Sequence, residues 1–367
     1  MYNEKILKNE EKAIFSLRSL YKQYGYLPFK MSKFEEYDLY VRNKDFLIGD
    51  KFITFNDTNG KLLALKPDVT LSIIKNTGDE EGCKHKVYYN ENVYRVSNGT
   101  HQFKEIMQTG LECIGSLDVL DTFEVVYLAA KSLDVVSSNF VLDISHIGVF
   151  SAVLDAASDN KAFKKAAARL VSEKNSHELV KLCKEYNVPD DKMNRIKVFA
   201  ELYGDMGKVI ARLEEICATE SEKSALSEFS ELCRLLSETE YKDKIRVDFS
   251  VINNMSYYTG VVFKGFLNGI CESVLSGGCY DPLLKSMGRK SSAIGFALYV
   301  DLLENLGSEA LLYDVDVLLL YSEKVDAREV LKIKNSLIAE GKSVSMQRRV
   351  PAKLRYKEKI VIGEEEK

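Results

Sequence analysis

Three Asn-Gly dipeptides, at residues 59–60, 98–99 and 268–269, constrain the fold of this 367-residue chain more than any other feature. Asn-Gly readily supplies the two positive φ angles of a tight hairpin, and each dipeptide here lies between runs of strand-like composition. We therefore expect the runs flanking each dipeptide to pair as antiparallel strands. The segments from Lys51 to Glu112 and from Ile245 to Ser276 are predicted to belong to an antiparallel sheet.

Helical segments surround and interrupt this sheet. Residues from about 149 to 240 are rich in Ala, Leu, Lys and Glu with helical periodicity, which predicts an insertion of helices. An amphipathic helix is expected at about 5–24, ending at Gly25. A short helix is expected near 281–287, and a more apolar one from Ala293 to about Leu306.

The last part of the chain alternates strand-like and helix-like segments. We predict strands at Val315–Tyr321, Ser343–Gln347 and Lys359–Gly363, with a helix at Ala327–Gly341 between the first two. The expected fold class is therefore α+β. Its expected domains are residues 1–310, a sheet flanked by helices with the insertion at about 149–240, and residues 311–367, a small α/β segment.

Composition excludes several classes of function. Lys and Arg number 51 against 55 Asp and Glu, a net charge of −4, so binding to nucleic acid is not expected. Residues 342–359 hold seven Lys and Arg against one acid, which a solvated loop explains more simply than RNA contact. Seven cysteines without a C-x-x-C pair favour a reducing cytoplasm. No apolar run approaches the ~20 residues of a membrane span, and no metal or cofactor motif is present, so neither membrane nor cofactor is expected.

One face of the strand that follows Asn98-Gly99 carries the most informative chemistry. Alternation places Gln108, Gly110 and Glu112 on one face, together with Lys104 and Ile106. A glycine between an amide and a carboxylate leaves a notch in which a small polar molecule could be recognised. The alternative is an ordinary solvated sheet face.

Two further segments are candidates for the same site. Tyr257 and Tyr258 are predicted to lie on opposite faces of one strand, so that only one faces a pocket; both could equally pack at the edge of the core. Gly277-Gly278 is expected before a helix, where it could cradle an anion or simply form a turn.

Taken in order, these segments resemble the histidyl-tRNA synthetase family of class II synthetase folds over nearly the whole chain. Residues 65–70, Leu-Lys-Pro-Asp-Val-Thr, resemble its L-R-P-[ED]-x-T segment. Tyr94-Arg95 and the Gln108-x-Gly110-x-Glu112 pattern resemble its second motif. Residues 257–260 and 277–281 are similar to its Y-Y-[TN]-[GR] and G-G-R-Y-D signatures, and residues 293–298 to the start of its third motif. Residues 311–367 resemble a reduced part of its anticodon-binding domain.

The resemblance implies a histidine pocket. Carboxylates suit it because the ammonium group and the imidazole N–H of histidine both donate hydrogen bonds. Arg95 could hold a ligand carboxylate or merely an acidic neighbour. The pocket residues that the resemblance implies are Asp68, Thr70, Arg95, Gln108, Glu112, Tyr257 and Tyr258.

Departures from the family pattern concern its arginines. Adenylation develops negative charge that fixed positive groups must stabilise. Asn253 stands where the family has the arginine of R-G-L-D, Cys279 replaces the arginine of G-G-R-Y-D, and Leu302 stands at the arginine that ends the third motif. We therefore expect no catalytic residue for adenylation.

This combination is similar to the synthetase-like regulatory subunits of ATP phosphoribosyltransferase, for which the string Met-Ser-Tyr-Tyr-Thr-Gly at 255–260 is typical. The resemblance implies a non-catalytic subunit of histidine biosynthesis that a separate, short catalytic subunit needs for activity, with histidine as an effector and with self-association as a dimer. Two alternatives stay open. One is a divergent histidyl-tRNA synthetase, or a paralogue that activates an amino acid with ATP; the other is a stand-alone amino-acid sensor.

Overall fold

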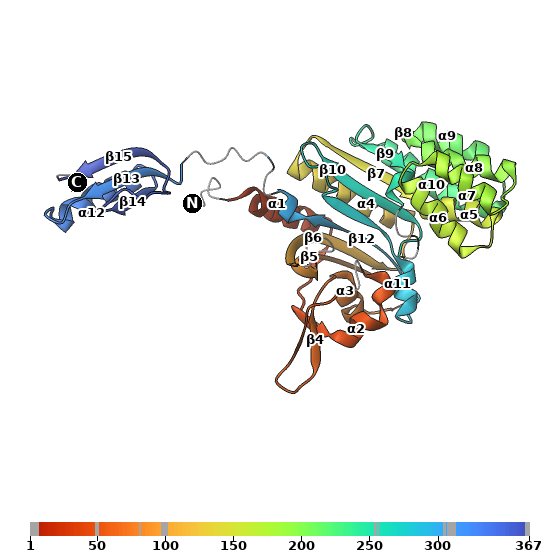
Figure 1. The fold of residues 1–367 in the computed structure, drawn as a ribbon, viewed down its shortest axis with the longest axis horizontal. Helices are drawn as coiled ribbons and strands as arrows, with labels where there is room; N and C mark the ends of the chain where they lie inside the picture. The colour runs from red at the N-terminus through yellow and green to blue at the C-terminus, as the bar shows by residue number, and fades with distance from the viewer. Residues whose placement is uncertain are drawn as a thin grey trace. The chain divides into compact units, whose positions relative to one another are not determined.

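The computed structural model describes residues 7–47, 51–80, 82–96, 102–252, 255, 257–303, 306 and 313–363. The chain forms two compact units, Met1–Leu306 and Gly307–Lys367, which we describe one at a time (Figure 1). The Asn98-Gly99 turn and Asn253 lie outside the described residues.

A nine-stranded sheet forms the centre of the larger unit. Its neighbours are antiparallel except for two parallel pairs, β1 with β5 and β7 with β9. The predicted α+β class is confirmed. In spatial order the strands are β1 (Leu27–Pro28), β5 (Lys84–Val96), β6 (Phe103–Gly115), β12 (Ser292–Tyr299), β11 (Leu275–Cys279), β10 (Val261–Leu267), β7 (Phe140–His146), β9 (Ile245–Asp248) and β8 (Tyr203–Gly204).

Two of the three Asn-Gly dipeptides lie in described turns. Gly60 (φ 80°) lies between β3 (Thr54–Asn56) and β4 (Leu62–Leu65), and Gly269 (φ 89°) lies between β10 and β11; both connected pairs are antiparallel. We expected the first pair to belong to the same sheet as the second. It belongs instead to a separate three-stranded sheet together with β2 (Phe34–Glu36).

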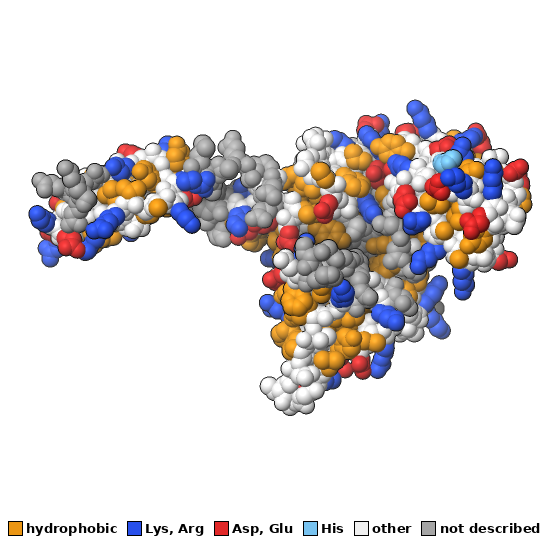
Figure 2. All heavy atoms as spheres, in the orientation of Figure 1, with side chains coloured by type: hydrophobic (Ala, Val, Ile, Leu, Met, Phe, Trp, Pro, Cys, Tyr) orange, Lys and Arg blue, Asp and Glu red, His pale blue; other side chains and the backbone are white. Residues whose placement is uncertain are grey.

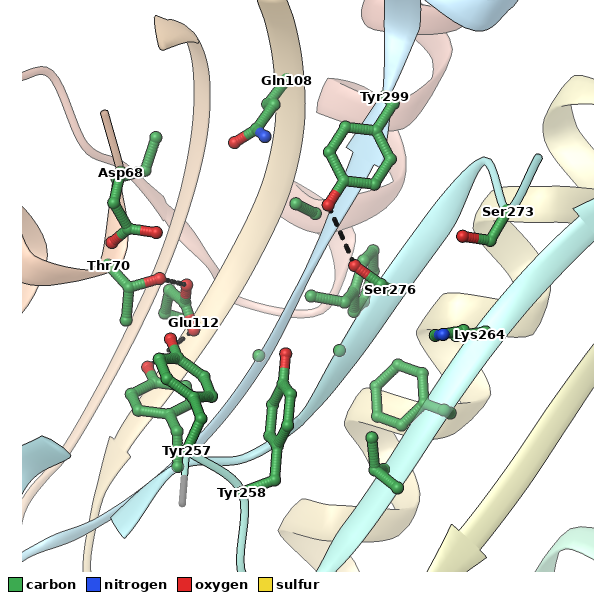
Figure 3. A pocket seen from close by; sticks show the side chains of 18 of the residues that line it. Asp68, Thr70, Gln108, Glu112, Tyr257, Tyr258, Lys264, Ser273, Ser276 and Tyr299 are labelled. Atoms are coloured by element: carbon green, nitrogen blue, oxygen red, sulfur yellow. Dashed lines mark hydrogen bonds between the residues drawn. The ribbon is translucent and has the colours of Figure 1, made fainter. Parts of the chain in front are cut away.

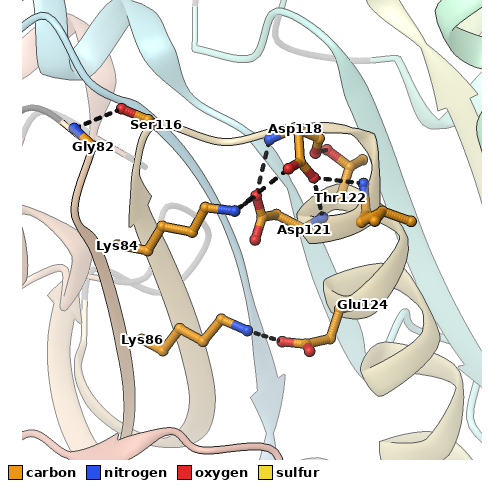
Figure 4. Close-up of polar contacts among 9 residues, drawn as sticks. Gly82, Lys84, Lys86, Ser116, Asp118, Asp121, Thr122 and Glu124 are labelled. Carbon is orange, nitrogen blue, oxygen red and sulfur yellow. Dashed lines mark hydrogen bonds and ion pairs between the residues drawn. The ribbon is translucent and has the colours of Figure 1, made fainter.

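One face of the large sheet packs against α1 (Asn9–Gln23) and α4 (Val119–Val136) (Figure 1). Tyr88, Leu111 and Cys113 point to this side and belong to the main hydrophobic core. Ion pairs also hold α4 against β5: Lys84 Nζ lies 2.5 Å from Asp121 Oδ2, and Lys86 Nζ lies 2.6 Å from Glu124 Oε1 (Figure 4).

The opposite face carries a second hydrophobic core, which includes Tyr89, Val93 and Tyr280. This core is completed by β4 of the small sheet and by three short helices, α2 (Tyr37–Arg42), α3 (Thr70–Asn76) and α11 (Asp281–Ser286). Because side chains alternate between the faces of a strand, Glu112 points to this side while its neighbours Leu111 and Cys113 point to the main core.

The predicted helical insertion is confirmed. Its helices pack with one another and with the main core through residues such as Phe150, Phe163 and Phe199. They are α5 (Ile147–Ala157), α6 (Lys161–Ser172), α7 (Ser176–Glu185), α8 (Asp190–Glu201), α9 (Met206–Ile216) and α10 (Glu220–Ser237).

Three local expectations are wrong. Where a helix was expected over 293–306, residues up to Tyr299 form strand β12 and Val300–Leu303 form a 3₁₀ turn. A central strand buried on both faces has a nearly continuous apolar run that resembles a buried helix. Gly277-Gly278 lies inside β11 rather than in a turn. Within the region predicted as strands, residues 70–76 form α3.

The smaller unit has the expected α/β order. In its parallel sheet β13 (Val315–Tyr321) lies between β14 (Val344–Gln347) and β15 (Tyr356–Ile362). Helix α12 (Ala327–Ala339) packs on this sheet, and Leu319, Val330 and Ile362 form a buried core. Among the described residues, none of the helices has the length and apolar character required to span a membrane.

Candidate functional site

A cavity of about 410 Å³ opens on the sheet face that carries the second core (Figure 3). Its lining comes from the α3 segment, from β5 and β6, from the residues preceding β10, and from β10, β11 and β12. The structure brings together all seven residues of the expected pocket, which are Asp68, Thr70, Arg95, Gln108, Glu112, Tyr257 and Tyr258.

Glu112 is the central acidic group of this cavity and is only 2% exposed. The Thr70 hydroxyl donates to Oε1 at 3.0 Å, and the Tyr280 hydroxyl donates to Oε2 at 2.6 Å. Burial raises the pKa of Glu112 to about 8, against the opposing effect of these two hydrogen bonds. A cationic ligand would favour the ionised carboxylate here.

Glycines on neighbouring strands provide the space for this carboxylate. Gly295 lies directly opposite Glu112, and a Cβ atom at Gly295 would come within 1.7 Å of Glu112 Oε2. A Cβ atom at Gly110 would lie 2.1 Å from the carbonyl oxygen of Phe296 and 2.6 Å from the Tyr89 hydroxyl. The expected notch beside Gly110 is therefore already filled by Tyr89, and the room for Glu112 comes from Gly295, which the sequence pattern did not single out.

Asp68 and Arg95 lie together at one wall. Asp68 Oδ1 accepts from the backbone N–H of Leu71 at 3.1 Å, at the start of α3, and burial raises the pKa of Asp68. Arg95 Nε donates to the carbonyl oxygen of Pro67 at 3.0 Å, so its guanidinium holds the segment that carries Asp68. The acidic side of the cavity is thus built from a partly buried carboxyl group, Asp68, and a buried one, Glu112, with Thr70 between them in sequence.

Tyr257 and Tyr258 both line the cavity, which corrects the expectation that only one could. They precede β10, which starts at Val261, so strand alternation does not apply to them. Their rings contact edge to face with centroids 4.6 Å apart. Tyr257 also contacts the rings of Phe46 and Tyr280.

The other side of the cavity has a different chemistry (Figure 3). Lys264 of β10 lines it with Ser273, Ser276 and Tyr299, and the Ser276 and Tyr299 hydroxyls are 3.1 Å apart. Burial lowers the pKa of Lys264. None of these four residues was expected, because an isolated polar residue in an apolar strand cannot be told from a solvated one by pattern alone.

Two of the three positions at which the family has arginines do not line this cavity. Cys279 lines a second cavity, Leu302 packs against the main core, and Asn253 is outside the described residues. Among the described residues that line the first cavity, the cationic ones are Arg95 and Lys264. The described part of the chain holds no cluster of His, Cys, Asp and Glu suited to a metal ion.

Known proteins resemble this chain along most of its length. A family model described as histidyl-tRNA synthetase matches residues 2–303. The ATP phosphoribosyltransferase regulatory subunit of Oceanobacillus iheyensis is 26% identical over 341 residues, which cover 91% of this chain and 84% of the relative. The protein of the same name from Bacillus cereus is 26% identical over 339 residues, which cover 90% of this chain and 80% of the relative.

Solved structures give the same result. A protein from Bacillus halodurans described as an ATP phosphoribosyltransferase regulatory subunit/histidyl-tRNA synthetase matches with a TM-score of 0.77 and 25% identity, covering 96% of this chain and 93% of that one. Histidyl-tRNA synthetase from Nostoc matches with a TM-score of 0.70 and 16% identity over 94% and 83% of the two chains. A chain of the HisG:HisZ complex of ATP phosphoribosyl transferase from Thermotoga maritima matches with a TM-score of 0.62 and 18% identity over 79% and 97%. At these identities the last two matches establish a shared fold.

Proposed function

Because the chain belongs to the histidyl-tRNA synthetase family, we propose that it is a non-catalytic member of that family, the regulatory subunit of an ATP phosphoribosyltransferase in histidine biosynthesis. The names of the curated relatives and of the Bacillus halodurans structure support this assignment. The partner is a separate, short catalytic subunit, as the HisG:HisZ complex suggests. The chain is required for the partner's activity, and histidine bound to the chain reduces that activity.

The single observation that carries the proposal is the composition of the first cavity. Two carboxyl groups, the buried Glu112 and the partly buried Asp68, lie there with Thr70, Gln108 and two tyrosines, a set that can accept hydrogen bonds from an ammonium group and an imidazole. Two cations, Arg95 and Lys264, also line the cavity, and Nε of Arg95 donates to the Pro67 carbonyl oxygen. The acidic side of the cavity is thus suited to the ammonium and imidazole groups of histidine.

The missing arginines support a non-catalytic role. Each fixed cation that meets charge in a transition state contributes several kcal/mol, so the loss of three should abolish adenylation. Cys279 is a thiol and Leu302 a hydrocarbon, and neither lines the first cavity. We propose that these two positions and Asn253 are where the chain lost the ability to form an acyl-adenylate.

Feedback by histidine requires that histidine bind two states of the complex with different affinity. The first cavity is a suitable place for this effector. We propose that its carboxyl groups hold the histidine side chain and amino group, with Glu112 as the main contact. The proposal also includes self-association as a dimer, a cytoplasmic setting, and a C-terminal unit, residues 311–367, that is a reduced relative of an anticodon-binding domain.

A mixing experiment tests the proposal. The purified chain is added to a short catalytic phosphoribosyltransferase from the same cell, with and without histidine, and formation of the phosphoribosyl-ATP product is followed. We expect the chain to raise the rate many-fold and histidine to reduce it by a factor of the order of 5–150. Glu112→Gln should keep the activation and lose the inhibition, whereas Cys279→Ala should keep both.

The contrary outcomes are distinct. Histidine-dependent exchange of pyrophosphate into ATP by the chain alone would identify a working synthetase. Failure to activate any short catalytic subunit, with histidine still bound, would indicate a stand-alone sensor. Unchanged inhibition in Glu112→Gln would place the effector at another site, such as the interface between subunits.

A further inference from the structure

A second cavity, of about 700 Å³, lies where the helical insertion meets the large sheet. It is lined by the start of α4, by the junction of β7 with α5, by one side of α10, and by the ends of β10 and β11. Its volume is in the range of pockets that hold small molecules. Nothing in the proposed function uses it.

A buried histidine with an unsatisfied nitrogen lines this cavity. His146 is 4% exposed, and its Nδ1 accepts from the backbone N–H of Val149 at 3.3 Å, where it caps α5. In the neutral ring the proton is therefore on Nε2. Nε2 is buried and has no hydrogen-bond partner among the described residues. Because buried polar groups are nearly always paired, this donor indicates a missing acceptor.

Glu228 of α10 supplies an acceptor next to that donor. Its Oε1 lies 3.7 Å from His146 Nε2, which is too far for a hydrogen bond, and its side chain is 64% exposed. A ligand group that bridges the two atoms from the side must accept from the imidazole and donate to the carboxylate. A hydroxyl group does both, whereas an ammonium group has no lone pair to accept with.

The charges around the cavity select the rest of the ligand. Asp118 also lines it, but its Oδ1 caps α4 and its Oδ2 lies 3.5 Å from Lys84 (Figure 4). Asp281 accepts from the N–H of Ala293 and from the Ser292 hydroxyl. Glu228 has His146 beside it, which lowers the pKa of this carboxyl and thus favours its ionised form, and no Lys or Arg lines the cavity within the described part of the chain. A carboxylate or phosphate on the ligand would be repelled, and an ammonium group would be attracted.

The remaining lining fits an apolar group. Leu117, Val119 and Leu232 line the cavity together with Cys279, a small side chain at the position where the family signature has an arginine. The nearby carboxylates of Asp281 and Glu228, after burial itself, raise the pKa of the Cys279 thiol and thus keep it neutral. A longer side chain at this position would occupy part of the cavity.

We propose that the second cavity binds a small amino alcohol, a cation with an apolar side chain whose hydroxyl group bridges His146 and Glu228. The hydroxyl accepts from His146 Nε2 and donates to Glu228, and the ammonium group neutralises the same carboxylate. The ligand would contact the core through His146 and the insertion through α10. This site is separate from the first cavity and goes beyond the proposed function.

The probe for the test is phenylalaninol, with two matched ligands. Phenylalanine has a carboxylate in place of the hydroxymethyl group, and 2-phenylethylamine lacks that group altogether. Binding to the full chain is measured by calorimetry in phosphate buffer, since Tris is itself an amino alcohol. We expect saturable binding of phenylalaninol and at least about tenfold weaker binding of both other ligands. 2-Phenylethylamine lacks the hydroxyl group that bonds to the Glu228 carboxylate, and the carboxylate of phenylalanine is repelled by it.

Variants locate the site. Glu228→Gln should weaken phenylalaninol at least about tenfold and should fold normally, because the side chain is largely exposed. Glu231→Gln is the matched control on the same helix. Glu231 pairs with Arg234 and does not line the cavity, so this variant should bind phenylalaninol with unchanged affinity. Absence of saturable binding, equal binding of the three ligands, or an undiminished affinity in Glu228→Gln would overturn the proposal. So would a loss in Glu112→Gln, which would place the amino alcohol in the first cavity.

Discussion

At the scale of single residues, the protonation of Glu112 links the first cavity to stability. Burial raises the pKa of this carboxyl from 4.5 to about 8 in the folded chain. Between these values the unfolded chain has released the proton and the folded chain still holds it, so the free energy of unfolding falls as pH rises. Above about pH 8 Glu112 is ionised in both states, and the free energy of unfolding no longer falls on its account.

We therefore predict that Glu112→Gln changes the pH dependence of stability. From pH 5 to pH 8 the native chain should lose of the order of 4 kcal/mol more unfolding free energy than the variant, since glutamine does not titrate. Thermal unfolding of both proteins over this range measures the difference. A parallel pH dependence in the two would mean that Glu112 is ionised at neutral pH in the free protein.

The sequence identified the acidic side of the cavity but not its surroundings. Asp68, Thr70, Gln108 and Glu112 could be named because each lies in a segment with a recognisable pattern. Tyr280 and Gly295 could not be assigned their roles in this way. The hydrogen bond of Tyr280 to Glu112 and the space beside Gly295 depend on which strands become neighbours, and a single sequence does not state that pairing.

At the scale of elements, the contact between β6 and β12 depends on Gly295. We predict that Gly295→Ala destabilises the chain by more than about 2 kcal/mol, because the new methyl group must displace a buried carboxylate. Histidine binding should be lost with it. Urea unfolding and calorimetry measure the two effects.

Gly207→Ala is the control for this change. Gly207 lies in the first turn of α9, and the nearest atom to its added Cβ would be Asp205 Oδ1 at an ordinary 3.5 Å. Alanine in a helix is favoured over glycine by up to about 1 kcal/mol, so this variant should be as stable as the native chain or more so. Equal losses in the two variants would show that Gly295 has no special role.

The helical insertion depends on a buried carboxylate. Glu222 of α10 is 0% exposed and accepts from the N–H groups of Ala218 and Thr219 and from the guanidinium of Arg195 on α8. Glu222→Ala leaves that guanidinium without its partner and should cost about 3–5 kcal/mol of unfolding free energy. Glu220 lies two residues earlier in the same helix, and its side chain is 97% exposed. Glu220→Ala should therefore change the free energy of unfolding by less than about 0.5 kcal/mol. Chemical denaturation distinguishes the two, and similar losses would contradict a special role for Glu222.

Elements with strong local signals were predicted well, and those set by tertiary context were not. The insertion helices have clear periodicity, with caps such as Thr219 and Asn160, so their existence follows from the sequence alone. Strand β12 has no charged position because both of its faces are buried, and its nearly continuous apolar run predicts a helix as readily as a strand. The backbone around Tyr257 and Tyr258 belongs to no helix or strand and follows no periodicity. Neither the position of both rings at the first cavity nor their contact with each other could therefore be predicted.

At the scale of the whole molecule, Lys and Arg lie interspersed with Asp and Glu over the insertion on the face seen in Figure 2, consistent with the near-balanced net charge of −4. Such a mixed surface suits contact with another protein better than contact with the uniform charge of nucleic acid. The partner proposed for this chain is accordingly a catalytic protein subunit.

Each of the two compact units has a buried core of its own, and this leads to a prediction about the whole chain. The core of Gly307–Lys367 contains Leu319, Val330 and Ile362, and the larger unit has two cores within residues 1–306. We expect calorimetry of the full chain to show two transitions. At ~0.7 kcal/mol per residue near 60 °C, the smaller unit should contribute about 40 kcal/mol and the larger one about 200 kcal/mol.

A chain ended after residue 306 should then lose only the smaller transition. The midpoint of the larger one should stay within about 2 °C, because the cores that determine it are retained. Histidine should bind the shortened chain as it binds the full one, since all the described residues that line the first cavity precede residue 300. A large fall in the midpoint, or loss of histidine binding, would mean that the C-terminal unit stabilises the cavity. Its proposed role would then be to support binding of the effector rather than contact with the catalytic partner.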